Sequence, residues 1–133
     1  MDQIANMLSS IKNAGLVKRD SIVVPHSTIK ASILEVLKRE GFIKTFEIID
    51  SGKNKKELKI VLEYVGKHPN VSPRVNNIER VSKLSKRVYI GYRDLHKFKF
   101  GKGLIIVSTP KGILTNKEAR KELVGGEVLF NIW

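Results

Sequence analysis

The sequence predicts an α+β protein of two lobes: an N-terminal α/β lobe over residues 1–66, and a C-terminal β-rich antiparallel lobe with a short helix over residues 71–133. Apolar residues in the first half alternate between helical and strand spacing. The second half consists mainly of short strand-like runs separated by turn residues. Between the halves, residues 65–73 contain one glycine and two prolines, which indicates a boundary.

The order predicted for the N-terminal lobe is helix, strand, helix, strand, strand. The first helix begins near Asp2, has apolar residues at helical spacing, and ends at residues 13–15. A short strand at residues 21–25 ends on a proline, and a second helix follows, with Ser27 as its N-cap. The strands over 42–50 and 56–64 form a hairpin, since the second alternates apolar and charged residues.

The C-terminal lobe is predicted to be antiparallel β-structure around one small helix. Thr115 and Glu118 have the spacing of a capping box, which predicts a helix beginning at Asn116. The other elements expected here are a weak strand at 75–81, strands at 87–91, 103–108 and 127–133, a helical turn at 93–98 and glycine turns at 100–103 and 124–126.

Composition excludes several classes of function. The chain has 133 residues, enough for one domain or two small lobes, and no cysteine, so disulfides and thiolate chemistry are absent. The longest apolar run, residues 104–107, is far too short to span a membrane. The N-terminus shows no signal-peptide pattern, so we expect a cytoplasmic protein.

Catalysis is not expected. The three histidines, His26, His68 and His96, lie far apart in the sequence and have no partners at metal-ligand spacing. The segment at 101–103 lacks the upstream glycine and the following hydroxyl of a phosphate-binding loop. We therefore predict no catalytic residue, no metal site and no cofactor, and a protein that is not an enzyme.

The net charge of +12 indicates an anionic partner. Residues 51–103 carry 14 Lys/Arg against 4 Asp/Glu, which is most of the excess. A membrane surface would favour an amphipathic helix with a basic face, whereas these bases lie on predicted hairpins and loops. A polynucleotide therefore fits better, and its phosphates could be neutralised by Lys53, Lys55, Lys56, Lys59, Lys67, Arg74, Arg80, Lys83, Lys86, Arg87, Arg93, Lys97, Lys99 and Lys102.

Two near-neutral segments of the C-terminal lobe have the composition of a contact surface. Ser108 to Gly112 combines hydroxyls with a glycine, and Gly125 to Glu127 combines two glycines with a carboxylate. Hydroxyls can bind ribose, base edges or phosphate, and a glycine lets a ligand approach the backbone. RNA suits such a surface because it is recognised by shape, stacking and ribose hydroxyls. Ordinary turns are the alternative for both segments, and a core position is the alternative for Tyr89, which could otherwise stack on a base.

At the C-terminus, "STPKGILTNKEARKELVGGEVLFNIW" (residues 108–133) closely resembles the signature of the bacterial family of the eighth small-subunit ribosomal protein. The segments "IANMLSSIKNA", "LKREGFI" and "RVSK…RVYIG" also resemble that family, so that the similarity extends in order along the whole chain.

The resemblance implies a structural constituent of the small ribosomal subunit that binds a stem in the central domain of its ribosomal RNA and supports subunit assembly. It implies neighbouring ribosomal proteins as partners and, in some members, binding of an operon messenger RNA that mimics the stem. A free translational repressor remains the alternative, since one surface would serve both roles. Carried over by position, the RNA-binding residues are Ser108, Thr109, Lys111, Gly112, Gly125, Gly126, Glu127 and Tyr89, with Lys12, Asn13 and Lys30 as weaker candidates.

This chain departs from the family pattern at three places. Pro110 replaces a usual serine and removes a hydroxyl and a backbone donor. Leu84-Ser85 stands where proline-glycine is common, and Ser10 occupies a usually basic position. Each departure puts a local contact with RNA in doubt.

Overall fold

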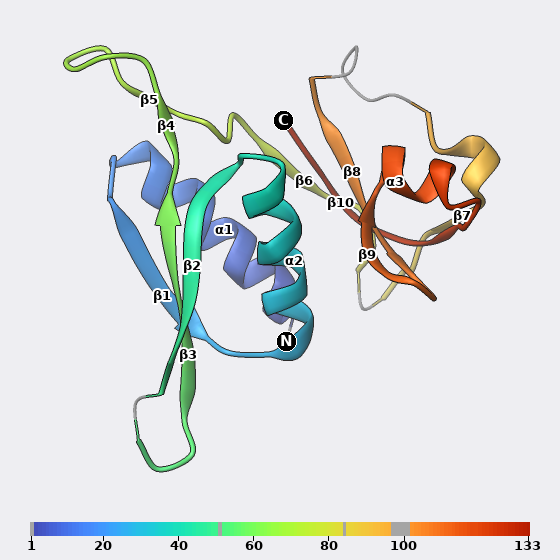
Figure 1. Cartoon of the computed structure of the whole chain (residues 1–133), viewed down its shortest axis with the longest axis horizontal. Helices are drawn as coiled ribbons and strands as arrows, with labels where there is room; N and C mark the ends of the chain where they lie inside the picture. The colour runs from blue at the N-terminus through green and yellow to red at the C-terminus, as the bar shows by residue number, and fades with distance from the viewer. Residues whose placement is uncertain (1, 51, 84, 97–101) are drawn as a thin grey trace. The chain divides into compact units, whose positions relative to one another are not determined.

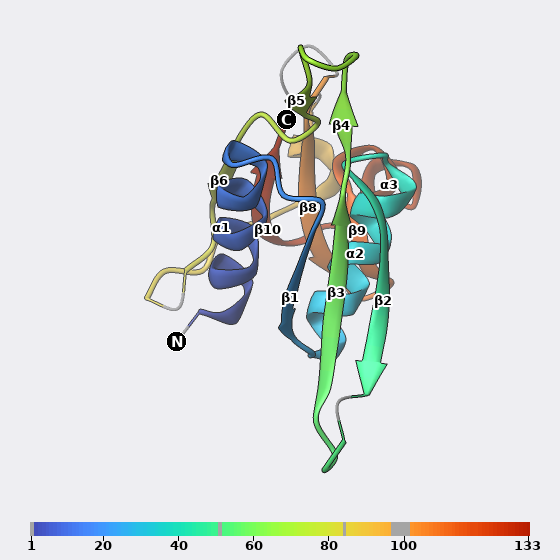
Figure 2. The ribbon, with the colours of Figure 1, turned by 90° about the vertical axis from the view of Figure 1, so that its left-hand side faces the viewer.

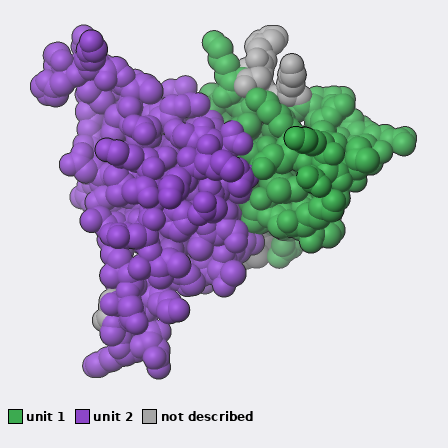
Figure 3. Space-filling model, in the orientation of Figure 1, with its two compact units in different colours: residues 1–2, 77–133 green, residues 3–76 purple. Residues whose placement is uncertain are grey.

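The computed structural model describes residues 2–50, 52–83, 85–96 and 102–133. Leu84, Lys97 and Lys99, for which the sequence suggested roles, lie outside these ranges. The chain divides into two compact units, one formed by residues 3–76 and the other by residues 77–133 together with Asp2 (Figure 3). The architecture is α+β, as the sequence predicts.

The N-terminal unit is a three-stranded antiparallel sheet with two helices on one face (Figure 1). Its elements are α1 (Gln3–Leu16), β1 (Ser21–Pro25), α2 (Thr28–Arg39), β2 (Ile43–Asp50) and β3 (Lys56–Leu62), with strand order β1-β3-β2. Leu58 and Ile60 of β3 are fully buried, because the central strand has a neighbour on each side and helices over one face. The side chain of Ser27 accepts a hydrogen bond from Lys30 N at 3.2 Å, which confirms the predicted N-cap of α2.

The β2–β3 hairpin extends beyond the two helices, so that its tip is exposed (Figure 2). Gly52, Lys53 and Asn54 have positive φ angles of 84°, 49° and 61°, which turn the chain back sharply. The hairpin therefore carries the lysines at 53, 55 and 56 away from the body of the unit.

The first compact unit extends to Asn76. A small hairpin of β4 (Tyr64–Val65) and β5 (Ser72–Pro73), which the sequence did not predict, returns the chain to the N-terminal unit. Arg74 then stacks over the ring of Phe42, 4.2 Å from its centroid. These contacts assign residues 71–76 to the first unit.

The described residues of the C-terminal unit form an antiparallel sheet with one short helix, α3 (Asn116–Lys121), and a 3₁₀ helix, η1 (Tyr92–Asp94). Its strands are β6 (Ile78–Arg80), β7 (Tyr89–Ile90), β8 (Leu104–Thr109), β9 (Gly112–Thr115) and β10 (Gly126–Ile132). The strand order is β6-β10-β8-β9, and β7 also pairs with β10. Strand β9 is an addition to the prediction, which had only a turn after Thr109; its four residues are too few to show a clear alternation.

Helix α3 is held by the capping box that the sequence predicts. Thr115 Oγ1 accepts from Glu118 N at 3.2 Å, and Glu118 Oε1 accepts from Thr115 N at 3.1 Å. The helix buries Ala119 against Val107 of β8 and Leu95, which follows η1. This packing covers one face of the sheet. No described helix is long and apolar enough to cross a membrane.

Candidate nucleic-acid interface

Three of the predicted RNA-binding residues form a row across neighbouring strands of the C-terminal sheet. In the pairing register, Glu127 of β10 lies directly opposite Tyr89 of β7 on one side and Ser108 of β8 on the other. Residues directly opposite each other in a sheet share a face. Tyr89 is 69% exposed and the other two are partly exposed, so this row lies on the open face of the sheet.

Each side chain in the row can make a different kind of contact. The exposed Tyr89 ring is available to stack on a base. The Ser108 hydroxyl makes no hydrogen bond within the described part of the chain, so its donor and acceptor are both available. The row therefore combines a stacking surface with polar groups.

Arg87 and Glu127 form an ion pair next to Tyr89. Arg87 Nη1 donates to both carboxylate oxygens of Glu127, at 3.2 Å each. The side chain of Glu127 is 15% exposed and that of Arg87 is 53% exposed. The pair orients the carboxylate and leaves the arginine accessible, as a phosphate contact requires.

The segment from Thr109 to Gly112 is a tight turn between β8 and β9. Thr109 pairs with Gly112, so the connection is only Pro110 and Lys111. Thr109 Oγ1 donates to Gly112 O at 2.8 Å and accepts from Lys111 N at 3.1 Å. Its hydroxyl therefore stabilises the turn. The structure explains why Pro110 can stand where the family usually has serine. Proline is favoured at the first corner of such a turn, and Gly112 takes the positive φ of 111°.

Gly125 and Gly126 are required by the protein's own backbone. A Cβ atom at Gly126 would lie 2.0 Å from Ser108 O, and one at Gly125 would lie 2.3 Å from Ile90 O. These glycines allow the start of β10 to fit between β7 and β8. The sequence attributed them to close approach of a ligand; in the structure they bring Tyr89, Glu127 and Ser108 onto adjacent strands.

The sequence analysis did not single out Ser82, although it orders the basic turn that precedes β7. Ser82 is 1% exposed; its hydroxyl donates to Val88 O at 3.3 Å and accepts from Val88 N at 2.9 Å. Lys83 and Lys86 pair backbone to backbone within the segment that these bonds close. The sequence does not reveal this role of Ser82, because its partner, Val88, is six residues away, outside the spacing of local turn and cap motifs.

Lys111 is exposed and forms an ion pair with Glu122, which follows α3 (Nζ to Oε2, 3.1 Å). Because both side chains are about half exposed, this pair contributes little to stability. Lys111 is therefore free to exchange Glu122 for another anion.

The N-terminal unit carries further predicted contact residues, among them Lys12, Asn13, Lys30, Lys55 and Lys56. Lys12 and Asn13 are exposed on α1, and Lys55 and Lys56 are exposed at the β2–β3 hairpin. Lys30 differs, since it lies on the inner side of α2 and is only 3% exposed. Burial lowers the pKa of its ammonium group by desolvation. This burial weighs against a direct contact between Lys30 and RNA.

The described residues contain no group of three or more His, Cys, Asp or Glu side chains that could hold a metal ion. The described carboxylates of the candidate interface are both engaged by cations, Glu127 by Arg87 and Glu122 by Lys111. What the arrangement offers is stacking, hydrogen bonding and positive charge.

The sequence matches the family model described as Ribosomal protein S8 over residues 2–133. Among similar proteins, the small ribosomal subunit protein uS8 of Petrotoga mobilis is 44% identical over 99% of this chain and 98% of its own length. The proteins of the same name from Kosmotoga olearia and Chloroflexus aurantiacus are 44% and 42% identical, again over 99% of this chain and over 98% and 97% of their own lengths. The chain therefore belongs to the ribosomal protein S8 family.

Proposed function

We propose that this protein binds a folded stem in the central domain of small-subunit ribosomal RNA through the open face of its C-terminal sheet. Family membership makes the chain a structural, non-catalytic constituent of the small ribosomal subunit, with ribosomal RNA and ribosomal proteins as partners. The proposal adds which surface binds and which RNA element it recognises.

The observation that carries the proposal is the row of Tyr89, Glu127 and Ser108 on three neighbouring strands. A flat row of one aromatic ring, one carboxylate and one hydroxyl matches what RNA presents at an irregular stem: unstacked bases, base amino groups and ribose hydroxyls. Phosphates alone do not explain such a row, because its exposed aromatic ring can stack on a base but cannot neutralise a phosphate.

Positive side chains border the row. Lys83, Lys86 and Arg87 are exposed on the turn before β7, and Lys111 lies at the tip of the β8–β9 hairpin. These cations hold the RNA backbone, whereas the row reads the shape of the stem. This division follows the general rule that phosphate contacts position a nucleic acid and contacts to bases specify it.

The experiment is a binding titration of the full chain with a transcript of the central-domain stem and with a random RNA duplex of equal length. We expect Ser108→Ala to weaken binding to the stem by about 5- to 10-fold, the value of one hydrogen bond, and to leave duplex binding unchanged. Ser72→Ala, an exposed serine of β5 in the other unit, is the matched control. Equal loss with both RNAs would contradict recognition by the row.

A third RNA addresses the alternative role as a free translational repressor. The messenger RNA of the protein's own operon, added as a competitor, would displace the stem if one surface binds both. Sedimentation of the protein with small subunits then distinguishes a ribosomal constituent from a free repressor.

A further inference from the structure

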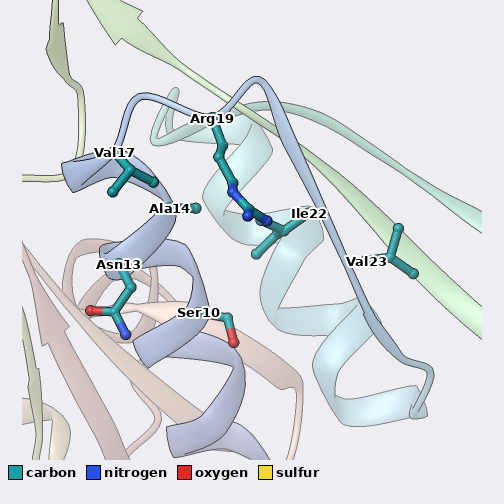
Figure 4. Close-up of a pocket in the computed structure, with 7 residues that line it drawn as sticks. All are labelled: Ser10, Asn13, Ala14, Val17, Arg19, Ile22 and Val23. Atoms are coloured by element: carbon teal, nitrogen blue, oxygen red, sulfur yellow. The ribbon is translucent and has the colours of Figure 1, made fainter.

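The N-terminal unit contains a groove that the RNA proposal does not use. It lies between α1 and β1 and has a volume of about 460 Å³ (Figure 4). Its lining is Ser10, Asn13, Ala14, Val17, Arg19, Ile22 and Val23. This volume is within the range of sites that hold a small ligand or a few residues of a peptide.

Strand β1 is an edge of the sheet, so one row of its backbone groups has no partner strand among the residues that the structure describes. At the ends of its pairing with β3, Leu62 N donates to Asp20 O at 2.9 Å and His26 N donates to Lys56 O at 3.1 Å. Hydrogen-bonded residues alternate along an antiparallel pair. The N–H and C=O groups of Ser21 and Val23 therefore point away from β3, toward the free edge.

The edge has apolar side chains beside it. Val23 is 53% exposed and Val17 is 68% exposed, although both are aliphatic. Together with Ala14 and Ile22 they make up most of the groove lining. An added strand at the edge would cover the exposed Val17 and Val23 and satisfy the unpaired backbone groups at the same time.

The side chain of Arg19 indicates the charge of the preferred partner. Arg19 is exposed at the groove and forms no ion pair with any described residue. Tyr64 Oη donates to Arg19 O at 2.5 Å, which fixes the backbone of this residue beside the groove. An exposed guanidinium next to an apolar edge favours a carboxylate on the partner.

We propose that the free edge of β1 binds an extended segment of a neighbouring small-subunit protein, one that places apolar side chains of its two faces against Val17 and against Val23, and a carboxylate against Arg19 (Figure 4). RNA fits less well, because four of the seven lining side chains are apolar and only one is a cation. Asn13, a weaker RNA candidate in the sequence, contributes to the α1 side of this lining. A second copy of this chain fits less well too, because each copy carries a net charge of +12. This inference does not depend on the RNA site.

Amide hydrogen exchange of the full chain tests the proposal in three states: free, bound to small-subunit ribosomal RNA alone, and assembled in complete small subunits. We expect the amides of Ser21 and Val23 to exchange about tenfold or more slowly only in the complete subunit, where the partner strand is present. Protection by RNA alone would assign the groove to RNA. Unchanged exchange in the complete subunit would show that the edge stays free. Either result would overturn the proposal.

Two pairs of variants examine the contacts themselves in assembled subunits. Val23→Pro removes the N–H that points to the free edge and leaves the hydrogen bonds to β3 intact, since a proline is tolerated in an edge strand. Val23→Thr is the control, because it keeps that N–H. We expect the protection of Ser21 to be lost with Val23→Pro and kept with Val23→Thr.

The second pair tests the charge of Arg19. Arg19→Gln should reduce the protection and Arg19→Lys should retain it, while binding of RNA by the free chain stays unchanged. Equal behaviour within both pairs would contradict the proposed strand.

Discussion

Individual residues at the candidate RNA interface divide into those that contact a ligand and those that shape the surface. The Ser108 hydroxyl is available, whereas the Thr109 hydroxyl is engaged with Gly112 and Lys111 in the turn. Two adjacent hydroxyls that look equivalent in the sequence therefore have different roles. Gly125 and Gly126 likewise shape the surface, because any side chain there would collide with the neighbouring strands.

The different roles of the two hydroxyls predict different phenotypes. Ser108→Ala should leave the free energy of unfolding within about 0.5 kcal/mol of the original protein while weakening stem binding. Thr109→Val should weaken stem binding and also lower the free energy of unfolding by about 1 kcal/mol, because two hydrogen bonds of the turn are lost. Urea unfolding and RNA titration of both variants check this. If Thr109→Val left stability unaltered, its hydroxyl would not be holding the turn.

Substitution of Gly126 by alanine should be severely destabilising. The added methyl group would lie 2.0 Å from Ser108 O, which is backbone and cannot move without disturbing the pairing of β10 with β8. We expect a loss of more than about 3 kcal/mol in thermal or urea unfolding. Gly91→Ala is the control, since nothing lies within 4 Å of its Cβ position and its φ is negative. A stable Gly126→Ala protein would mean that the strands can separate at this point.

Lys30 allows a test of the electrostatic cost of burial. Desolvation lowers its pKa below the ordinary 10.5, so the unfolded chain binds more protons than the native one as pH approaches that value. The contribution of Lys30 to stability therefore rises with pH in that window and is unfavourable at neutral pH. Lys30→Met should raise the free energy of unfolding at pH 7, and this gain should shrink as pH rises toward 10.5.

The exposed Lys12 is the matched control for Lys30, because it lies on the other helix of the same unit. Lys12→Met should leave stability the same at both pH values. If Lys30→Met stabilised the protein equally at both pH values, the effect would come from packing and not from the charge of Lys30.

At the level of secondary-structure elements, α3 depends on a local signal and covers the core. Its capping box fixes where the helix begins, and Ala119 then packs against Val107 and Leu95. Because the helix has only six residues, it needs both the cap and the packing. Ser82 plays a comparable role for the basic turn before β7, since it closes that turn with two hydrogen bonds.

Removal of the cap should therefore loosen the C-terminal core. Thr115→Ala deprives Glu118 N of its acceptor, and we expect a loss of about 1 kcal/mol in the free energy of unfolding. Lys117→Ala, at an exposed position of the same helix, should change stability by less than about 0.5 kcal/mol. Chemical denaturation compares the two variants. Equal effects would show that helix propensity and not the cap limits α3.

For the whole molecule, positive charge is shared evenly between the units. Residues 3–76 contain 13 Lys/Arg and 7 Asp/Glu, and the remainder contains 12 and 6, so each unit has a net charge of +6. The excess that the sequence concentrates in residues 51–103 is thus divided by the fold. In the first unit, Lys53, Lys55 and Lys56 lie on the β2–β3 hairpin; in the second, Lys83, Lys86 and Arg87 lie on the turn that leads into β7.

This distribution predicts that the hairpin lysines act by charge alone. Replacing Lys55 and Lys56 by glutamine should weaken binding to the cognate stem and to random duplex by the same factor, and should reduce the dependence of affinity on salt by about two phosphate contacts. Binding titrations over a series of salt concentrations measure both effects. A loss confined to the stem would instead place sequence- or shape-specific contacts on the hairpin.

The sequence by itself determined the fold class, most element positions and the family, because these depend on local spacing: helical and alternating periodicity, the caps at Ser27 and Thr115, and the C-terminal signature. Only the tertiary structure decided the roles of Thr109, Gly125, Gly126 and Lys30, together with the unit boundary. Each of these depends on a partner from another strand or loop, or on burial by the fold. Pairing register and burial are properties of the packed chain, and local sequence patterns do not record them.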